Sequence, residues 1–81
     1  MQVYFCRFVD DEEWGSYVAA GHSGQAKAIF YRSFKDNGVW NDIRCCKVKE
    51  IPDDILIAPQ CLGAPEDPVL KMLGLKYREI E

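Results

Sequence analysis

The stretch AGHSGQAKAIFYRSFKDNG, residues 20–38, decides the fold because it carries the start and stop signals of one helix. Ser23 is a good N-cap, since its hydroxyl can accept a hydrogen bond from a free amide of the first turn. Gly38 after Asn37 predicts a left-handed stop at the other end. We therefore expect a helix over residues 23–37. At about 100° per residue, its apolar side packs on a sheet through Ala26, Ile29, Phe30 and Phe34.

The segments on both sides of this helix have the composition of strands. Residues 3–9 (VYFCRFV) are β-branched and aromatic on both faces, which predicts a central strand. Residues 16–20 (SYVAA) are compatible with a second strand, joined to the first by an acidic hairpin loop. Residues 43–51 (IRCCKVKEI) predict a third strand, although regular alternation would put Lys47 and Lys49 on the face of the apolar ends. A β-bulge in this strand would remove that conflict.

The rest of the chain is less regular, because all four prolines lie in it. Residues 55–58 are compatible with a strand or a buried turn. Pro68 suits the first position of a short helix, which Gly74 would end. Residues 75–80 (LKYREI) are a candidate edge strand.

Length and composition agree with one small domain. At 81 residues, the chain is near the lower limit for folding without disulfides, metals or partners. Apolar residues make up 48% of it, which argues against disorder. We expect one α+β domain over residues 1–81: a small antiparallel sheet with a ββαβ core (residues 1–51) covered by one main helix, and a C-terminal extension (residues 52–81) packed on it. Homodimerisation or a partner would stabilise so small a core.

The sequence predicts a cytoplasmic protein. Residues 1–13 (MQVYFCRFVDDEE) are briefly apolar and then acidic, whereas a signal peptide has a basic start and a longer apolar stretch. No apolar run approaches a membrane span, which needs about 18 residues. We therefore expect no membrane contact, and cysteines that stay reduced. The net charge of −3 gives no general reason to bind nucleic acid.

The four cysteines do not predict a metal site. Cys6, Cys45, Cys46 and Cys61 form no C-x-x-C pair, whereas structural zinc sites take their ligands in two close pairs. Cys45 and Cys46 are adjacent on a predicted strand, so their side chains would point to opposite faces. We expect no metal, and buried, inert cysteines that pack as small apolar residues.

No catalytic constellation is apparent either. A cysteine nucleophile would need His22, the single histidine, as its base, together with a third group to orient it. The glycines around His22 match neither a P-loop nor a dinucleotide-binding loop, and they are better explained by a tight connection into the helix. We expect no cofactor and no enzyme, with a Cys–His22 enzyme as the least supported class.

Aromatic and acidic residues are the candidate protein contacts. The acidic run at residues 10–13 does not have the spacing of a calcium loop, and a solvated hairpin tip is its plainer interpretation. An aromatic residue beside such a loop is often buried or at an interface, and aromatic side chains are common anchors of protein interfaces. The candidate contacts are Asp11, Glu12, Trp14, Tyr31 and Trp40.

The outer side of the helix offers a nucleic-acid alternative. Cations there could contact phosphates while Tyr31 stacks on a base. These cations are Lys27, Arg32 and Lys35, and Arg44 would extend the patch if it lies nearby. A plain solvated helix face accounts for the same pattern.

Residues 18–48 carry a family likeness. Its parts are an alanine pair, a helix with spaced aromatics and a basic closing strand: Ala19-Ala20, Ser23, Ala26-Lys27, Phe30, Phe34 and residues 43–48 (IRCCKV). In these elements, residues 1–50 resemble small uncharacterised phage and prophage accessory proteins. The resemblance implies a mobile-element protein in a bacterial cytoplasm and assigns no catalytic residue. We therefore expect a non-enzymatic accessory protein that binds a host or phage protein, with a small nucleic-acid-binding module as the alternative.

Overall fold

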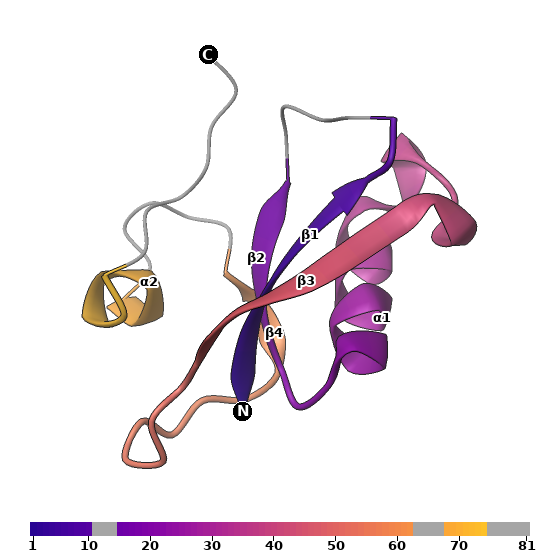
Figure 1. The fold of residues 1–81 in the computed structure, drawn as a ribbon. Coiled ribbons are helices and arrows are strands. Elements are labelled where there is room, and N and C mark those ends of the chain that lie inside the picture. Colours follow the sequence, from indigo (N-terminus) through magenta and orange to yellow (C-terminus); the bar gives the residue numbers. More distant parts are fainter. Residues whose placement is uncertain (11–14, 63–67, 75–81) are drawn as a thin grey trace.

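The fold is a four-stranded antiparallel sheet with a helix on each face (Figure 1). This computed structural model describes residues 1–10, 15–62 and 68–74. Along the chain the elements are β1 (Gln2–Phe8), β2 (Ser16–Ala20), α1 (Ser23–Phe34), β3 (Ile43–Glu50), β4 (Gln60–Leu62) and α2 (Pro68–Met72). The strand order is β3-β1-β2-β4. The expected α+β class is confirmed, including the short C-terminal helix.

Strand β1 is central, as its composition predicts. It pairs with β2 on one side and with β3 on the other, both antiparallel. Its side chains are buried on both faces of the sheet: Tyr4 and Cys6 point to the α1 face, while Val3 packs on the α2 face. A strand covered on both sides needs apolar residues at successive positions, which is why it lacks a polar/apolar alternation.

The expected β-bulge lies in β3 at Val48. Tyr4 is opposite Lys47 and Val3 is opposite Lys49, so Val48 is the extra residue. The bulge moves Lys49 away from the α1 face. The Nζ atom of Lys49 donates a hydrogen bond of 2.8 Å to the Leu73 carbonyl. Lys47 and Lys49 therefore lie on opposite faces of the sheet, which removes the conflict in the sequence pattern.

His22, and not Ser23, caps helix α1. The Nδ1 atom of His22 accepts from the Gln25 amide at 3.1 Å, and Gln25 Oε1 accepts from the Gly21 amide at 2.7 Å. The expected Ser23 cap is wrong because Ser23 is already helical, and the residue with extended backbone directly before it is His22.

The other end of the helix also differs from expectation. Helix α1 ends at Phe34, and a 3₁₀ turn covers Lys35–Asn37. Gly38 has extended backbone with φ of 179°, so the left-handed stop expected there is wrong. Packing explains the glycine instead, since a Cβ at this position would come 2.6 Å from Cδ1 of Phe8.

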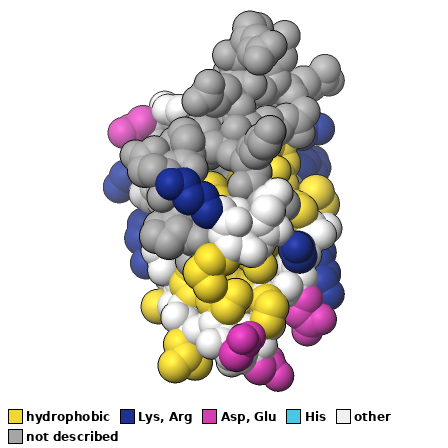
Figure 2. Space-filling view, turned by 90° about the vertical axis from the view of Figure 1, so that its left-hand side faces the viewer, with side chains coloured by type: hydrophobic (Ala, Val, Ile, Leu, Met, Phe, Trp, Pro, Cys, Tyr) yellow, Lys and Arg dark blue, Asp and Glu magenta, His cyan; other side chains and the backbone are white. Residues whose placement is uncertain are grey.

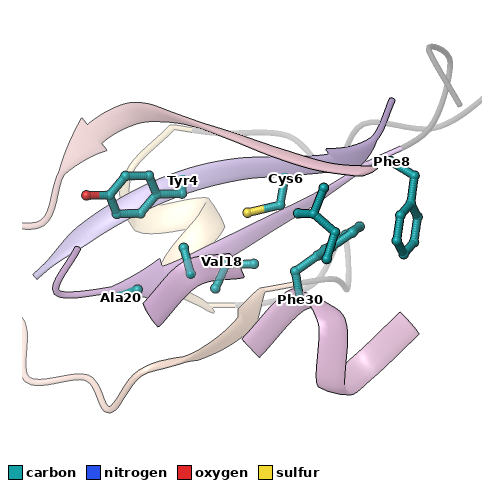
Figure 3. Close-up of a cluster of buried hydrophobic side chains, with 8 residues drawn as sticks. Tyr4, Cys6, Phe8, Val18, Ala20 and Phe30 are labelled. Carbon is teal, nitrogen blue, oxygen red and sulfur yellow. The ribbon is translucent and has the colours of Figure 1, made fainter. Parts of the chain in front are cut away.

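The main core lies between the sheet and α1 (Figure 3). Phe30 is fully buried at its centre, with ring centroids 5.2 Å from Phe8 and 5.0 Å from Phe34. Ile29 and Phe34 are partly buried against the same cluster, which confirms the predicted sheet-packing side of the helix. The buried members of this core are Tyr4, Cys6, Phe8, Val18, Ala20, Ala26, Phe30 and Ile43.

A second core lies on the opposite face, under α2. It contains Val3, Ala19, Ile51, Leu62, Leu70 and Leu73. Strand β4, which the sequence pattern does not predict, pairs with β2 and brings Leu62 to this cluster. The extension over residues 52–81 thus adds a strand and a helix to the ββαβ core.

Residues 55–58 form no strand, and Gly74 ends α2 as expected. Ile55 and Ile57 are half-buried against the second core, while Leu56 is 94% exposed. Gly74 has φ of 73°, and its amide donates to the Lys71 carbonyl at 3.2 Å. The candidate edge strand at residues 75–80 lies outside the described residues.

The α2 side carries hydrophobic side chains at its surface. Figure 2 shows them gathered in the lower part of this side. Among the described residues, neither helix has the length and apolar character that crossing a membrane requires.

Candidate functional site

The candidate site lies where α1 meets β3, and its residues are Lys27, Tyr31, Trp40 and Cys45. We call this set the α1–β3 seam. Lys27 and Tyr31 are four positions apart, so they lie on the same flank of α1. Trp40 begins the 3₁₀ turn that leads into β3, and Cys45 lies in β3 itself.

The turn that carries Trp40 is held by backbone hydrogen bonds. The Asp42 amide donates to the Val39 carbonyl at 3.0 Å, and the Ile43 amide donates to the Trp40 carbonyl. The Asp42 carbonyl accepts from the Val9 amide at 2.6 Å, which ties the turn to the end of β1. The backbone at Trp40 is therefore tied to the sheet.

Two side chains of α1 fix the Trp40 ring. Lys27 Nζ lies over the ring, 4.7 Å from its centroid, which is a cation–π contact. The Tyr31 ring lies edge-on to it, with centroids 5.5 Å apart and an angle of 83° between the planes. Trp40 nevertheless stays 40% exposed. The result is an aromatic side chain that is ordered and still open to solvent.

Cys45 lies directly opposite Cys6 across β1 and β3. Cys6 is fully buried in the main core, and Cys45 is half-buried against it. The hydrogen bond between the two thiols lowers the pKa of Cys45, and the charge of Lys27 lowers it further, although partial burial opposes both. The same hydrogen bond, together with burial, raises the pKa of the Cys6 thiol far above its usual range. The pair therefore favours a thiolate on Cys45 and a proton on Cys6.

The other two cysteines lie apart from this pair. Cys46 is exposed and points to the opposite face from Cys45, so the expectation that all cysteines are buried is wrong for it. Cys61 is half-buried in β4, and its Sγ lies 3.1 Å from Ser16 Oγ. All four thiols are free. Within the described ranges, no group of three or more His, Cys, Asp and Glu side chains is placed to hold a metal ion.

The structure places two of the five predicted protein contacts together. Tyr31 and Trp40 touch each other in the seam. Asp11, Glu12 and Trp14 lie outside the described residues.

The predicted nucleic-acid contacts lie on three elements, α1, the 3₁₀ turn after it and β3. Lys27 is half-buried over Trp40, while Arg32 and Lys35 are exposed at the end of α1. Arg44 is opposite Arg7 and so points away from the face that carries Cys45; it donates to the carbonyls of Asn41 at 2.8 Å and Ile43 at 3.1 Å. Lys27 is therefore grouped with the aromatic residues, whereas Arg44 projects from the other face of β3.

Sequence reasoning missed the Cys6–Cys45 pair and the place of Lys27. Both depend on which strands are neighbours and in what register, and no local pattern encodes either. The one usable signal was the presence of cysteines at inward positions of two predicted strands.

A pocket of about 380 Å³ lies at the far end of β3, lined by Glu50, Ile51, Pro52 and Asp53. Two of these four lining residues carry carboxylates and two are apolar, and among the described residues none of the four is aromatic or a nucleophile. The α1–β3 seam, in contrast, combines aromatic rings, a cation and a thiol, so we take it as the candidate site.

Comparison with known proteins gives no match: no protein-family model, no curated protein and no solved structure is similar to this chain. The site is therefore defined by its own chemistry. Its parts are an ordered exposed indole, a partly buried cation and a thiol.

Proposed function

We propose that this protein is a small, non-enzymatic interaction protein that binds a protein partner through the α1–β3 seam. The observation that carries the proposal is the state of Trp40, which is 40% exposed and held by contacts with Lys27 and Tyr31. Exposed tryptophans dominate the binding energy of many interfaces. Holding the ring in place beforehand lowers the entropy cost of ordering it on binding.

The surroundings of Trp40 suit a partner that is apolar at its centre and acidic at its edge. Val39, the neighbour of Trp40 in the chain, is 58% exposed and extends the apolar surface. Lys47 lies further along β3 from Trp40, on the α1 face and opposite Tyr4. An apolar centre with charged groups around it is the usual composition of a protein interface. The cations Lys27 and Lys47 favour a partner with carboxylates at its rim.

The open edge of β3 adds backbone groups to this surface. In the order β3-β1-β2-β4, the described part of β3 has a strand on one side only. An extended peptide can pair with such an edge. The bulge at Val48 restricts that pairing to the residues before it, next to the seam.

A nucleic-acid-binding module is the second candidate, and the grouping of Lys27 with two aromatic rings favours it. Lysines with aromatic rings are a common means of holding single strands. Lys27 already occupies a face of the Trp40 ring, however, so that a base cannot stack there. The protein-binding proposal therefore has the stronger support.

The biological setting is proposed from the sequence resemblance. The resemblance of residues 1–50 to phage and prophage accessory proteins supports an accessory role in a bacterial cytoplasm, with a host or phage protein as partner. A homodimer that uses the same seam is a further outcome that the experiment below distinguishes.

The test is a pull-down from bacterial lysate with tagged wild type, Trp40→Ala and Leu56→Ala, each with and without nuclease. Leu56 is a matched control, since it is an exposed hydrophobic residue outside the seam. We expect wild type and Leu56→Ala to retain one protein both with and without nuclease, and Trp40→Ala to lose that protein. With the purified partner, Kd should rise at least about 30-fold for Trp40→Ala, which corresponds to about 2 kcal/mol.

Three results would count against the proposal. Retention by Trp40→Ala would show that the seam is not the contact. Loss of all bound material after nuclease treatment would favour the nucleic-acid module. A bait that captures only itself, with a dimer in size-exclusion chromatography, would identify the seam as a self-association surface. Circular dichroism of each variant checks that it is folded.

A further inference from the structure

The register of β1 and β3 places two thiols at disulfide-forming positions. Cys6 and Cys45 are directly opposite on neighbouring antiparallel strands. Directly opposed residues of such strands have Cα atoms about 4.5 or 5.5 Å apart, and disulfides need about 4.4–6.8 Å. Both side chains lie on the α1 face, where Cys6 belongs to the main core and Cys45 packs against it. The Cα spacing of this pair is therefore within the range of a disulfide.

The other cysteines cannot compete for this bond. Cys46 points to the opposite face, and Cys61 lies in β4. Strands β1 and β2 separate β4 from β3. Neighbouring strands are about 4.8 Å apart, so β4, which carries Cys61, is roughly 14 Å from β3 with Cys45 and roughly 10 Å from β1 with Cys6. Cys6 and Cys45 are the pair that fits.

The two members of the pair differ in access. Cys45 is half-buried on an edge strand, so a small reagent can reach it, while Cys6 is fully enclosed. Lys27 places positive charge near Cys45 and so favours its thiolate, which is the reactive form of cysteine. An oxidant would therefore meet Cys45 first and Cys6 second.

We propose that Cys45 is an oxidation site for small hydroperoxides and that Cys6 resolves it into a disulfide between β1 and β3. The Cys45 thiolate attacks the peroxide, the O–O bond breaks, and Cys45 becomes a sulfenic acid while hydroxide leaves and is protonated to water. The Cys6 sulfur then attacks the Cys45 sulfur, the S–O bond breaks, and the departing hydroxide takes the Cys6 proton. With hydrogen peroxide, two thiols and one peroxide give one disulfide and two waters.

This chemistry does not depend on the proposed function. It needs the sheet register and the exposed side of Cys45, and it stands whether or not the seam binds a protein. Its consequence for the seam is local, because oxidation removes the Cys45 thiolate from the neighbourhood of Lys27.

The experiment uses Cys46→Ser as the parent, because Cys46 is exposed and would add an unrelated reactive thiol. The folded protein is treated with limiting hydrogen peroxide, free thiols are blocked with iodoacetamide, and the sample is digested with trypsin without reduction. Trypsin cuts after Arg7, Arg44 and Lys47. We expect residues 1–7 joined to residues 45–47, an intact mass lower by two hydrogen atoms, and two free thiols lost per chain.

The control is Cys45→Ser in the same parent. Its buried Cys6 should remain alkylatable only after unfolding, with no linked peptide. Oxidation of Cys45 without a link to Cys6 would overturn the proposal, as would a bond from Cys45 to Cys61 or no reaction of Cys45 at all. The parent changes only an exposed position and keeps the pair, so we expect it to fold, and circular dichroism checks that a negative result does not come from loss of the fold.

Discussion

Lys27 lies over the indole of Trp40, with Nζ 4.7 Å from the ring centroid, and this contact joins α1 to the turn that leads into β3. The helix is therefore bound to the sheet in two ways. Its apolar side packs on the main core through Ala26 and Phe30, and its flank is held by a cation–π contact at the edge.

Replacing Lys27 with Met should lower the free energy of unfolding by about 0.5–1 kcal/mol, because it removes the cation and keeps the aliphatic stem. Urea unfolding followed by circular dichroism measures the change. Lys35→Met is the control, since Lys35 is exposed in the following 3₁₀ turn. Equal stability of the two variants would mean that the contact adds nothing.

Replacing Phe30 with Ala should cost about 3–5 kcal/mol, since Phe30 is fully buried between two aromatic rings. Such a loss approaches the whole stability of a small domain. Phe30→Leu, with an expected cost below about 1.5 kcal/mol, therefore provides a second measurable point. A loss under about 1 kcal/mol for Phe30→Ala in thermal unfolding would contradict the packing of α1.

Replacing Gly38 with Ala should destabilise the protein by about 1–3 kcal/mol, as overpacking of a filled core does. The new Cβ would come 2.6, 2.8 and 2.9 Å from three atoms of the Phe8 ring. Gly24→Ala is the control in chemical denaturation, because its Cβ meets only the exposed His22 ring at 3.3 Å. We expect that control to stay within about 1 kcal/mol of wild type. If Gly38→Ala behaves in the same way, the ring of Phe8 is free to move.

Alkylation of Cys45 by iodoacetamide should have a midpoint below pH 9.0, the ordinary pKa of a cysteine thiol, because the thiol of Cys6 hydrogen-bonds to it and Lys27 is nearby. Mass spectrometry of residues 45–47 in the Cys46→Ser protein follows the rate against pH. Cys6→Ala should raise the midpoint, whereas Cys6→Ser keeps a donor and should raise it less. An unchanged midpoint in Cys6→Ala would show that the thiol–thiol contact does not stabilise the thiolate.

The same pair makes stability depend on pH in alkaline solution. Above pH 9.0 both thiols of the unfolded chain lose their protons, but the folded chain keeps the one on Cys6, whose pKa is raised. The folded state then binds more protons, so the pair's contribution to stability falls as pH rises, by about 1.4 kcal/mol per pH unit. Below pH 9.0 the lowered pKa of Cys45 acts in the opposite sense, and stability rises with pH.

Urea unfolding of wild type and Cys6→Ala between about pH 9 and 11 tests this linkage. Tyrosine and lysine titrate in the same range, so the difference between the two slopes is the quantity to compare. Wild type should lose stability more steeply. Parallel curves would mean that Cys6 ionises in the folded state as it does in the unfolded one.

Much of the architecture was predictable because it follows from the local sequence. The apolar side of α1 and the need for a bulge in β3 come from the spacing of apolar residues within one segment, while the central strand β1 comes from its β-branched and aromatic composition. Residues 16–20, which are compatible with a strand, form β2 with the same bounds. The short strand β4 was missed, since three residues between prolines carry no period of their own.

Positions that depend on distant contacts were predicted less well. Gly38 has the sequence context of a helix stop, but its role is to make room for the Phe8 ring. Ser23 is a residue type that often caps helices, but here it is the first residue of α1, and the N-cap is His22. The sequence rule for helix stops failed at Gly38 because of packing against Phe8. The sequence rule for N-caps failed at Ser23 because the helix starts at that residue.

The sequence by itself determined most segments of this protein, namely β1, β2, α1, β3 and α2, and which side of α1 is apolar. Tertiary structure alone decided the site, because the pairing of β1 with β3 brings Cys6 to Cys45 and the docking of α1 brings Lys27 and Tyr31 to Trp40. The physical reason is that periodicity is a property of neighbouring residues, whereas strand register is settled by the burial of the whole sheet face at once.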